Sequence, residues 1–157
     1  STSRPTALLL SRQNLPHQAR SAQQLQDLHR GGYVLSDRND ARAVILATGS
    51  EVDLAMQAQR LLDERGLPVR VVSLPSTTVF DRQDRSWRDS VLGRGLPRIG
   101  IEAGVTRWWG QYGCADALGV DSFGESAPAA ALYQHFGLTA TALADRVQHC
   151  VQSAAAA

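Results

Sequence analysis

Residues 43–62, AVILATGSEVDLAMQAQRLL, decide the fold. Their first five residues form a continuous apolar run, which is typical of a strand that helices cover on both faces of a sheet. Gly49 then predicts a turn, and Ser50 predicts the N-cap of a helix with Asp53 at its third position. Apolar side chains follow at the spacing of one helix face, at Leu54, Ala58, Leu61 and Leu62. Strand, turn and helix in this order predict an α/β fold.

The same alternation continues on both sides of this unit. Short runs of strand-like composition occur at residues 32–35, 69–74, 98–102 and 117–120. Residues 7–10, ALLL, form another apolar run, and we expect a buried strand there because Pro5 precedes it and polar residues follow it. Strands that alternate with helices predict a parallel sheet that is covered on both faces.

Capping and stop signals place the other helices. Ser21 predicts a helix start with Gln24 as its capping-box partner, and the pair Gly31-Gly32 predicts the stop. A single short helix is predicted around three apolar side chains, Phe80, Trp87 and Val91. The last two helices are expected to begin at Pro128 and Thr139. One core-facing stripe is predicted for the final helix, at Leu143, Val147, Cys150 and Val151.

Size and charge exclude several classes of protein. A chain of 157 residues can bury enough surface to form a domain without a disulfide or a metal. The net charge of +1 gives no electrostatic indication of nucleic acid or an anionic membrane. No apolar run is long enough for a membrane span. Cys114 and Cys150 stand far apart without metal-ligand spacing, which favours reduced, buried thiols in a cytoplasmic protein.

The two ends of the sequence indicate a piece of a longer polypeptide. The first residue is Ser1, and the single methionine is Met56. An apolar run follows almost at once, as if the chain entered in the middle of a domain. Residues 153–157, SAAAA, are expected to be a frayed end.

Arg12 is the first candidate site residue. It follows the apolar run 7–10, and ligands of open α/β sheets gather beyond the carboxyl ends of strands. Its guanidinium could hold a phosphate through two parallel hydrogen bonds. From local sequence alone, a role in an ordinary surface ion pair is the commoner outcome for such an arginine.

Other candidates each have a structural alternative. The turn at Ser50 opens a helix and could receive an anion, although plain capping explains it better. Asp81 and Asp84 would lie one turn apart on the single short helix, where acid–base chemistry, metal binding or a charge-balanced face are possible. Glu102 ends a buried strand, so its pKa is a candidate for perturbation, and it could also cap the next loop or pair with Arg107.

The remaining chemistry-bearing residues give no reaction. The histidines lack ligand spacing, and no nucleophile-elbow motif is present. An aromatic group could form a partner-binding patch or part of the core, namely Trp108, Trp109 and Tyr112. Taken alone, the residues describe an α/β domain with one suggestive arginine.

Several longer segments resemble transketolases of the bacterial type. Residues 7–16, ALLLSRQNLP, are similar to the segment that ends the pyrimidine-binding domain of that family. Further segments follow in the family's order and spacing: GGYVLSD at 31–37, ATGSEV at 47–52, RVVSLPS at 70–76, FDRQ at 80–83, EAG at 102–104 and FGESAP at 123–128. The resemblance covers nearly the whole chain and is loosest at residues 91–97.

This resemblance implies a three-layer α/β/α fold with a mixed, mostly parallel five-stranded sheet. Residues 32–35 would be its one antiparallel edge strand. Residues 1–21 would be the terminal strand and loop of the preceding pyrimidine-binding domain, and residues 22–157 the transketolase C-terminal domain.

It also implies a function for the parent protein, the transfer of a two-carbon ketol unit from a ketose phosphate to an aldose phosphate. Family members use thiamine diphosphate and a divalent metal, usually Mg²⁺, which the N-terminal and pyrimidine-binding domains hold. Arg12 matches the arginine of the family's Ser-Arg-Gln motif and would bind the sugar phosphate. No catalytic, cofactor-binding or metal-binding residue is expected in this chain, so it should be inactive alone.

The expected partners are the sugar phosphate, the other two domains and a second copy in a homodimer, without nucleic acid or membrane. Two alternatives remain open from the sequence. One is the same domain of a related thiamine diphosphate enzyme, such as dihydroxyacetone synthase. The other is a stand-alone regulatory or anion-binding module that uses the helix start at Ser50.

Overall fold

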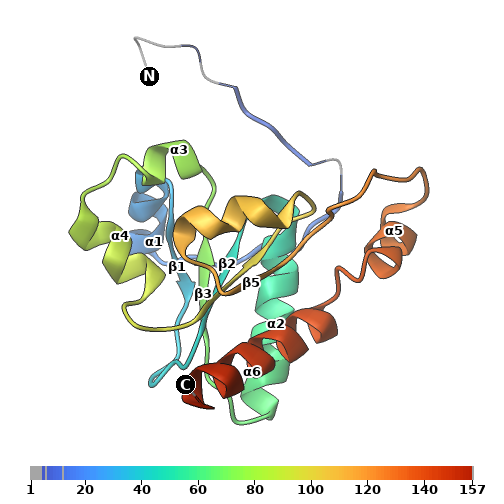
Figure 1. Cartoon of the computed structure of the whole chain (residues 1–157). Coiled ribbons are helices and arrows are strands. Elements are labelled where there is room, and N and C mark those ends of the chain that lie inside the picture. The colour runs from blue at the N-terminus through green and yellow to red at the C-terminus, as the bar shows by residue number, and fades with distance from the viewer. Residues whose placement is uncertain (1–4, 6, 12, 157) are drawn as a thin grey trace.

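The computed structural model describes residue 5, residues 7–11 and residues 13–156 (Figure 1). Arg12 therefore lies outside the described residues. The elements follow in the order α1 (Ala22–Asp27), η1 (Leu28–Arg30), β1 (Tyr33–Ser36), β2 (Val44–Ala47), η2 (Gly49–Glu51), α2 (Val52–Glu64), β3 (Arg70–Ser73), α3 (Thr77–Phe80), α4 (Arg85–Leu92), β4 (Arg98–Ile101), η3 (Thr106–Tyr112), β5 (Asp116–Leu118), α5 (Ala129–His135) and α6 (Ala140–Ala156).

The sheet confirms the predicted fold class. Five strands pair in the order β1-β3-β2-β4-β5, and β1 is antiparallel to β3 while the other pairs are parallel. The register of β1 shifts between Val34 and Ser36, which is a bulge on this edge strand. The other edge strand, β5, has only three residues.

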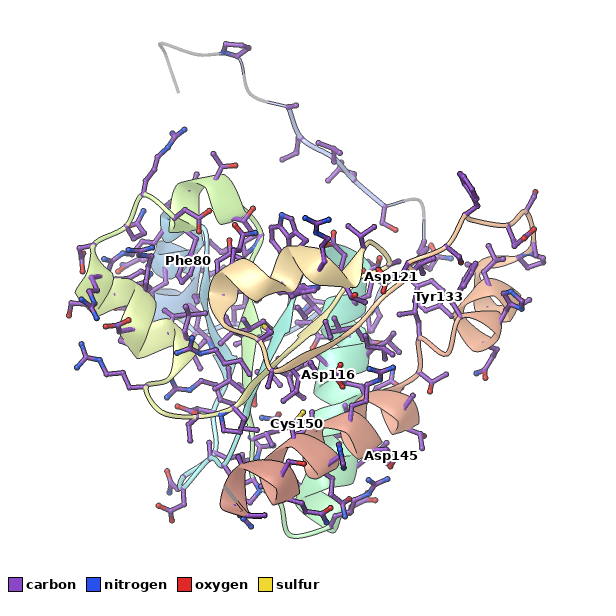
Figure 2. All side chains as sticks on the ribbon, in the orientation of Figure 1. Phe80, Asp116, Asp121, Tyr133, Asp145 and Cys150 are labelled. Atoms are coloured by element: carbon purple, nitrogen blue, oxygen red, sulfur yellow. The ribbon has the colours of Figure 1, made fainter. Side chains whose placement is uncertain are left out.

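The central strand β2 divides the core into two halves because its side chains alternate between the two faces. Ile45 and Ala47 pack in one half with α2 and α6, which contact each other closely. Val44 and Leu46 pack in the other half with Phe80 and with residues of α4 and η3. In Figure 1, α3 and α4 accordingly lie apart from α2 and α6, and Figure 2 shows Phe80 far from Cys150 on α6.

The predicted helix ends are largely confirmed. Ser21 and Gln24 form a reciprocal capping box, and Gly31 ends η1 with a φ of +82°. Pro128 precedes α5, and the Thr139 hydroxyl accepts a hydrogen bond from the Ala142 backbone N–H at 3.1 Å.

Two predicted elements are wrong, for local reasons. The single helix around residues 80–91 is two helices, because the Asp84 carboxylate accepts from the Trp87 backbone N–H at 2.8 Å and starts α4 as its N-cap. Asp81 therefore follows the end of α3 and does not share a helix with Asp84. The predicted frayed end is wrong for residues 153–156, which belong to α6. Alanine is the best helix former, so the helix continues through Ala156.

Residues 7–10 do not form the buried strand that their composition predicts. Leu8, Leu9 and Leu10 are 80%, 90% and 79% exposed. A strand needs a neighbouring strand to pair its backbone, and the described residues place none beside this segment.

Glycine at position 100 permits the aromatic layer to approach the sheet. Gly100 lies between Ile99 and Ile101 on β4, and its face is covered by Trp109 of η3. A Cβ atom built on Gly100 would lie 2.2 Å from Trp109 Cδ2, far inside van der Waals contact. Trp109, Trp108 and Tyr112 form T-shaped or tilted ring pairs, and two of the three are buried, so this aromatic group belongs to the core.

Gly100→Ala should lower the free energy of unfolding of the chain by about 1–3 kcal/mol, because the new methyl group must displace Trp109. Urea unfolding followed by tryptophan fluorescence measures the change. Gly124→Ala is the matched control, since a Cβ there meets nothing within 4 Å, and its effect should stay within about 0.5 kcal/mol. Equal unfolding midpoints for the two variants would contradict the packing of Trp109 against β4.

Candidate functional site

The carboxyl edge of the parallel strands carries the polar groups that could form a site. From β2 the chain continues to β3, which lies on one side of β2, and then to β4, which lies on the other side. The direction in which the chain crosses the sheet therefore reverses next to β2. Ligand crevices of open α/β sheets lie at such a point. A hollow of about 690 Å³ opens here, with Thr48, Thr77 and Glu102 among its lining residues.

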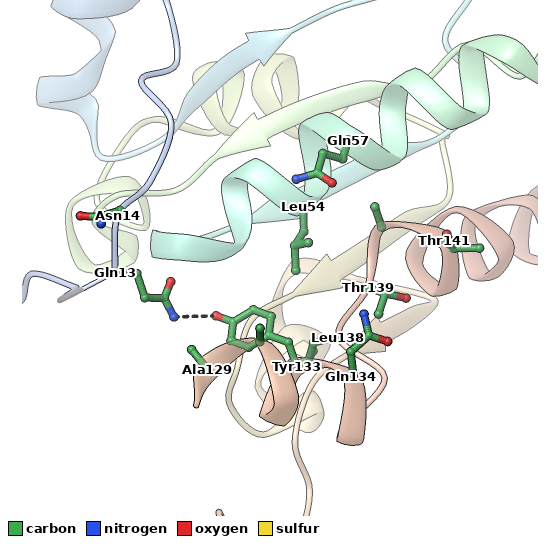
Figure 3. A pocket seen from close by; sticks show the side chains of 12 residues that line it. Gln13, Asn14, Leu54, Gln57, Ala129, Tyr133, Gln134, Leu138, Thr139 and Thr141 are labelled. Carbon is green, nitrogen blue, oxygen red and sulfur yellow. Dashed lines mark hydrogen bonds between the residues drawn. The ribbon is translucent and has the colours of Figure 1, made fainter. Parts of the chain in front are cut away.

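Residues 13–20 run along this same edge and are fastened to it by side chains. Gln18 Nε2 donates to Asp53 Oδ1 at 3.3 Å, and Arg20 Nε donates to the hydroxyl of Tyr33 at 2.6 Å. Gln13 Nε2 donates to the hydroxyl of Tyr133 at 3.4 Å, as Figure 3 shows. The neighbouring residue Arg12, the predicted phosphate-binding residue, lies outside the described residues, and its role stays a prediction.

Glu51 is the buried polar centre of the edge, and sequence reasoning missed it. Only 3% of Glu51 is exposed. Its Oε1 accepts from the Ser50 hydroxyl at 2.8 Å and from the hydroxyl of Tyr133, which comes from α5. The positive end of the α2 dipole favours a carboxylate at this position. An acidic residue at the start of a helix is the sequence signal that could have identified it.

The prediction that Ser50 caps a helix is wrong. Residues Gly49–Glu51 form a 3₁₀ turn before α2, and no side chain caps either start. The Ser50 hydroxyl turns to the Glu51 carboxylate instead. A negative charge already occupies the helix start, which disfavours binding of an anion there.

Tyr133 connects α5 to the rest of the domain. No residue of α5 is fully buried, so few packing contacts hold this helix. Partial burial raises the pKa of Tyr133, and the Glu51 carboxylate that accepts its hydrogen bond raises this pKa further, while Gln13 and Ser50 oppose part of the rise. The hydroxyl therefore stays protonated and remains a donor to Glu51 throughout the neutral range.

A second hollow, of about 530 Å³, lies beside Tyr133 between residues 13–14, α2, α5 and the start of α6 (Figure 3). Its polar side chains are amides and hydroxyls from Gln13, Asn14, Gln57, Gln134, Thr139 and Thr141. None of the described residues that line it is charged.

The pKa of Glu102 is raised, as its place at the end of a strand predicted. Burial is the main cause, and the negative charge of Glu51 contributes, while the side chain of Thr48 opposes the rise. The predicted alternative of an ion pair with Arg107 is not among the ion pairs of the described part of the chain.

The other candidates do not come together. Asp81 accepts from the hydroxyl of Tyr112 at 3.0 Å, whereas Asp84 caps α4 and pairs with Arg30 at 3.4 Å. Across the described residues, no group of three or more His, Cys, Asp or Glu side chains could hold a metal ion. Burial raises the pKa of Cys114 to about 12, so this thiol is not a nucleophile at neutral pH.

Among the helices that the structure describes, none has the length and apolar character to cross a membrane.

Comparison with known proteins identifies the family. Residues 31–139 match the model of the transketolase-like TK C-terminal domain. A plasmid-encoded transketolase of Cupriavidus necator is 55% identical over 139 residues, which are 86% of this chain and 20% of that protein.

Solved structures agree with this assignment. Transketolase from Leishmania mexicana superposes with a TM-score of 0.84 at 37% identity, over 90% of this chain and 21% of that one. The Pichia stipitis enzyme in complex with sedoheptulose-7-phosphate gives 0.83 at 35% identity, over 90% of this chain and 20% of that one. The chain thus spans about a fifth of the length of these relatives. It belongs to the transketolase family and contains the family's C-terminal domain.

Proposed function

We propose that this chain is the C-terminal part of a transketolase, which transfers a two-carbon ketol unit from a ketose phosphate to an aldose phosphate. The match of residues 31–139 to the family's C-terminal domain carries this proposal. Its relatives are transketolases about five times as long as the matched segment. We infer that residues 1–21 end the preceding pyrimidine-binding domain and that the C-terminal domain begins near residue 22.

Arg12 is the residue that we propose to bind the phosphate of the sugar. The motif Ser11-Arg12-Gln13 supports the assignment. The solved complex of the Pichia stipitis enzyme with sedoheptulose-7-phosphate supports a sugar phosphate as the ligand. A guanidinium presents several fixed N–H donors and matches phosphate geometry better than an ammonium group does. Its two neighbours, Ser11 and Gln13, are exposed and thus leave the segment accessible to a ligand.

The full-length enzyme would use thiamine diphosphate and Mg²⁺, and the described residues of this chain contain no group of three or more His, Cys, Asp or Glu side chains that could hold the metal ion. Among the described carboxylates at the carboxyl edge, Glu51 accepts from two hydroxyls and Asp53 accepts from Gln18 and Gln57. We therefore assign both groups to the other domains of the full-length enzyme.

A homodimer, a cytoplasmic location and a role in the pentose phosphate pathway or the Calvin cycle complete the proposal. Family resemblance supports each of them. The stand-alone anion-binding module is the weaker alternative. Such a module would bind an anion at the start of α2, where the Glu51 carboxylate already lies and would repel it. Dihydroxyacetone synthase would share this domain, and donor specificity of the full-length enzyme distinguishes it.

In the full-length enzyme, Arg12→Ala should raise the KM for a phosphorylated ketose about 10- to 100-fold, since hydrogen bonds to a charged group are worth about 1.5–3 kcal/mol. The KM for an unphosphorylated ketose should change less than about threefold. Steady-state kinetics with both donors test this. Arg94→Ala is the control, because Arg94 is exposed and pairs with Asp89 of α4 at 2.8 Å. Equal effects of Arg12→Ala on both donors would remove the phosphate role.

The isolated 157-residue chain should neither bind thiamine diphosphate nor turn over a ketose phosphate, because the proposed cofactor residues lie in other domains. Titration calorimetry with thiamine diphosphate and Mg²⁺, together with a coupled activity assay, tests this, and the full-length enzyme is the positive control. Binding by the isolated chain at micromolar concentration would contradict the division of labour proposed here.

A further inference from the structure

Side chains attach the segment before the C-terminal domain to that domain at three places. At one end, Arg20 contacts β1 through Tyr33, and at the other end, Gln13 contacts α5 through Tyr133. Gln18 adds a middle contact to Asp53 on α2. Residues 13–20 form no helix or strand of their own, so these side chains hold their course along the carboxyl edge.

The Arg20 attachment is strong and rests on a buried group. Tyr33 is completely buried, and its hydroxyl lies 2.6 Å from Arg20 Nε. The same guanidinium donates through Nη1 to the backbone carbonyl of Gln18 at 2.7 Å, so it fixes the direction of the chain as well as its end. Hydrogen bonds from a charged donor are shorter and roughly twice as strong as neutral ones.

The attachment at Tyr133 connects residues 13–20 to Glu51, the buried carboxylate of the carboxyl edge. The Tyr133 hydroxyl donates to this carboxylate and accepts from Gln13 Nε2. A hydroxyl that serves as donor and acceptor at once has a fixed direction. Gln13 is therefore tied through Tyr133 to the start of α2, which follows the central strand β2.

We propose that Tyr33 and Tyr133 are positioning residues of the C-terminal domain, which set the affinity for the sugar phosphate by fastening residues 13–20. This inference rests on the proposed function, in which Arg12 binds the phosphate. Because Arg12 and Gln13 are consecutive in the sequence, we expect the contact between Gln13 and Tyr133 to bear on the residue that precedes Gln13. Neither tyrosine needs to touch the substrate.

The physical reason is preorganisation. A bidentate contact between a guanidinium and a phosphate tolerates errors of only a fraction of an ångström in the position of the side chain. A segment that is fastened before binding loses less conformational freedom when the ligand arrives. Release of residues 13–20 should weaken phosphate binding without changing the chemical step, so KM should respond and kcat should not.

The test uses the full-length enzyme with Tyr33→Phe, Tyr133→Phe and the double variant, each of which removes a hydroxyl and keeps the ring. The double variant should raise the KM for a phosphorylated ketose about 5- to 20-fold, because it removes the two tyrosine hydrogen bonds to residues 13–20. Its kcat and its KM for an unphosphorylated ketose should stay within about twofold. Gln18→Ala changes a partly exposed side chain and replaces the tyrosine variants in the test if either of them folds poorly. It should raise the KM for the phosphorylated ketose by a smaller factor and leave the KM for the unphosphorylated ketose unchanged.

Tyr112→Phe is the matched control. It removes a tyrosine hydroxyl that donates to Asp81 at 3.0 Å, in the other half of the core, and it should change neither KM. Hydrogen exchange supplies a readout apart from activity: amides of residues 13–20 should exchange faster in the double variant and at the normal rate in Tyr112→Phe.

The Arg12→Ala background separates the two proposals. If Arg12→Ala raises KM selectively for the phosphorylated donor, adding the tyrosine variants should raise it less than about twofold further, because both act through one contact. Full additivity, or a rise that is equal for both donors, would overturn the positioning role and leave the phosphate role of Arg12 intact. An unselective Arg12→Ala variant would overturn the phosphate role itself, and the positioning role with it.

Discussion

The burial of β2 on both faces is the constraint on which the rest of the structure depends. Residues Val44–Ala47 are completely buried, and they pair in parallel with β3 on one side and β4 on the other. Their side chains have to be covered by two layers of helices, one from α2 and α6 and one from α3, α4 and η3. The turn that leaves β2 also delivers Glu51 to the carboxyl edge, so the same strand fixes the polar centre of the edge.

The fold could be predicted from the sequence because its signals are local. The apolar run at residues 43–47, the capping box at Ser21 and the glycine stop at Gly31 each act within a few residues. One failure was local as well: the predicted single helix is two, because α3 ends at Phe80 and Asp84 caps the start of α4. Residues 7–10 failed for a different reason, since a strand is defined by its neighbour and the described chain provides no neighbour for it.

The candidate site could be predicted only in part, because its contacts span long stretches of the chain. Glu51 and Tyr133 are 82 residues apart, and Gln13 and Tyr133 are 120 residues apart. No spacing rule within one element connects such pairs. Glu102 was identified because the end of a buried strand is a local feature, and burial there raises its pKa. Arg12 was identified by its resemblance to a family motif, and the contact of its neighbour Gln13 with Tyr133 is the basis on which we propose that the C-terminal domain influences binding.

The two edges of the sheet have a consequence for how copies of this domain meet. The bulge in β1 and the three-residue length of β5 leave neither edge with a long, regular row of free N–H and C=O groups. Such edges are poor templates for an added strand, which is how natural sheets avoid uncontrolled fibre growth. We therefore expect an ordered association between two copies to use helices and loops rather than an added strand.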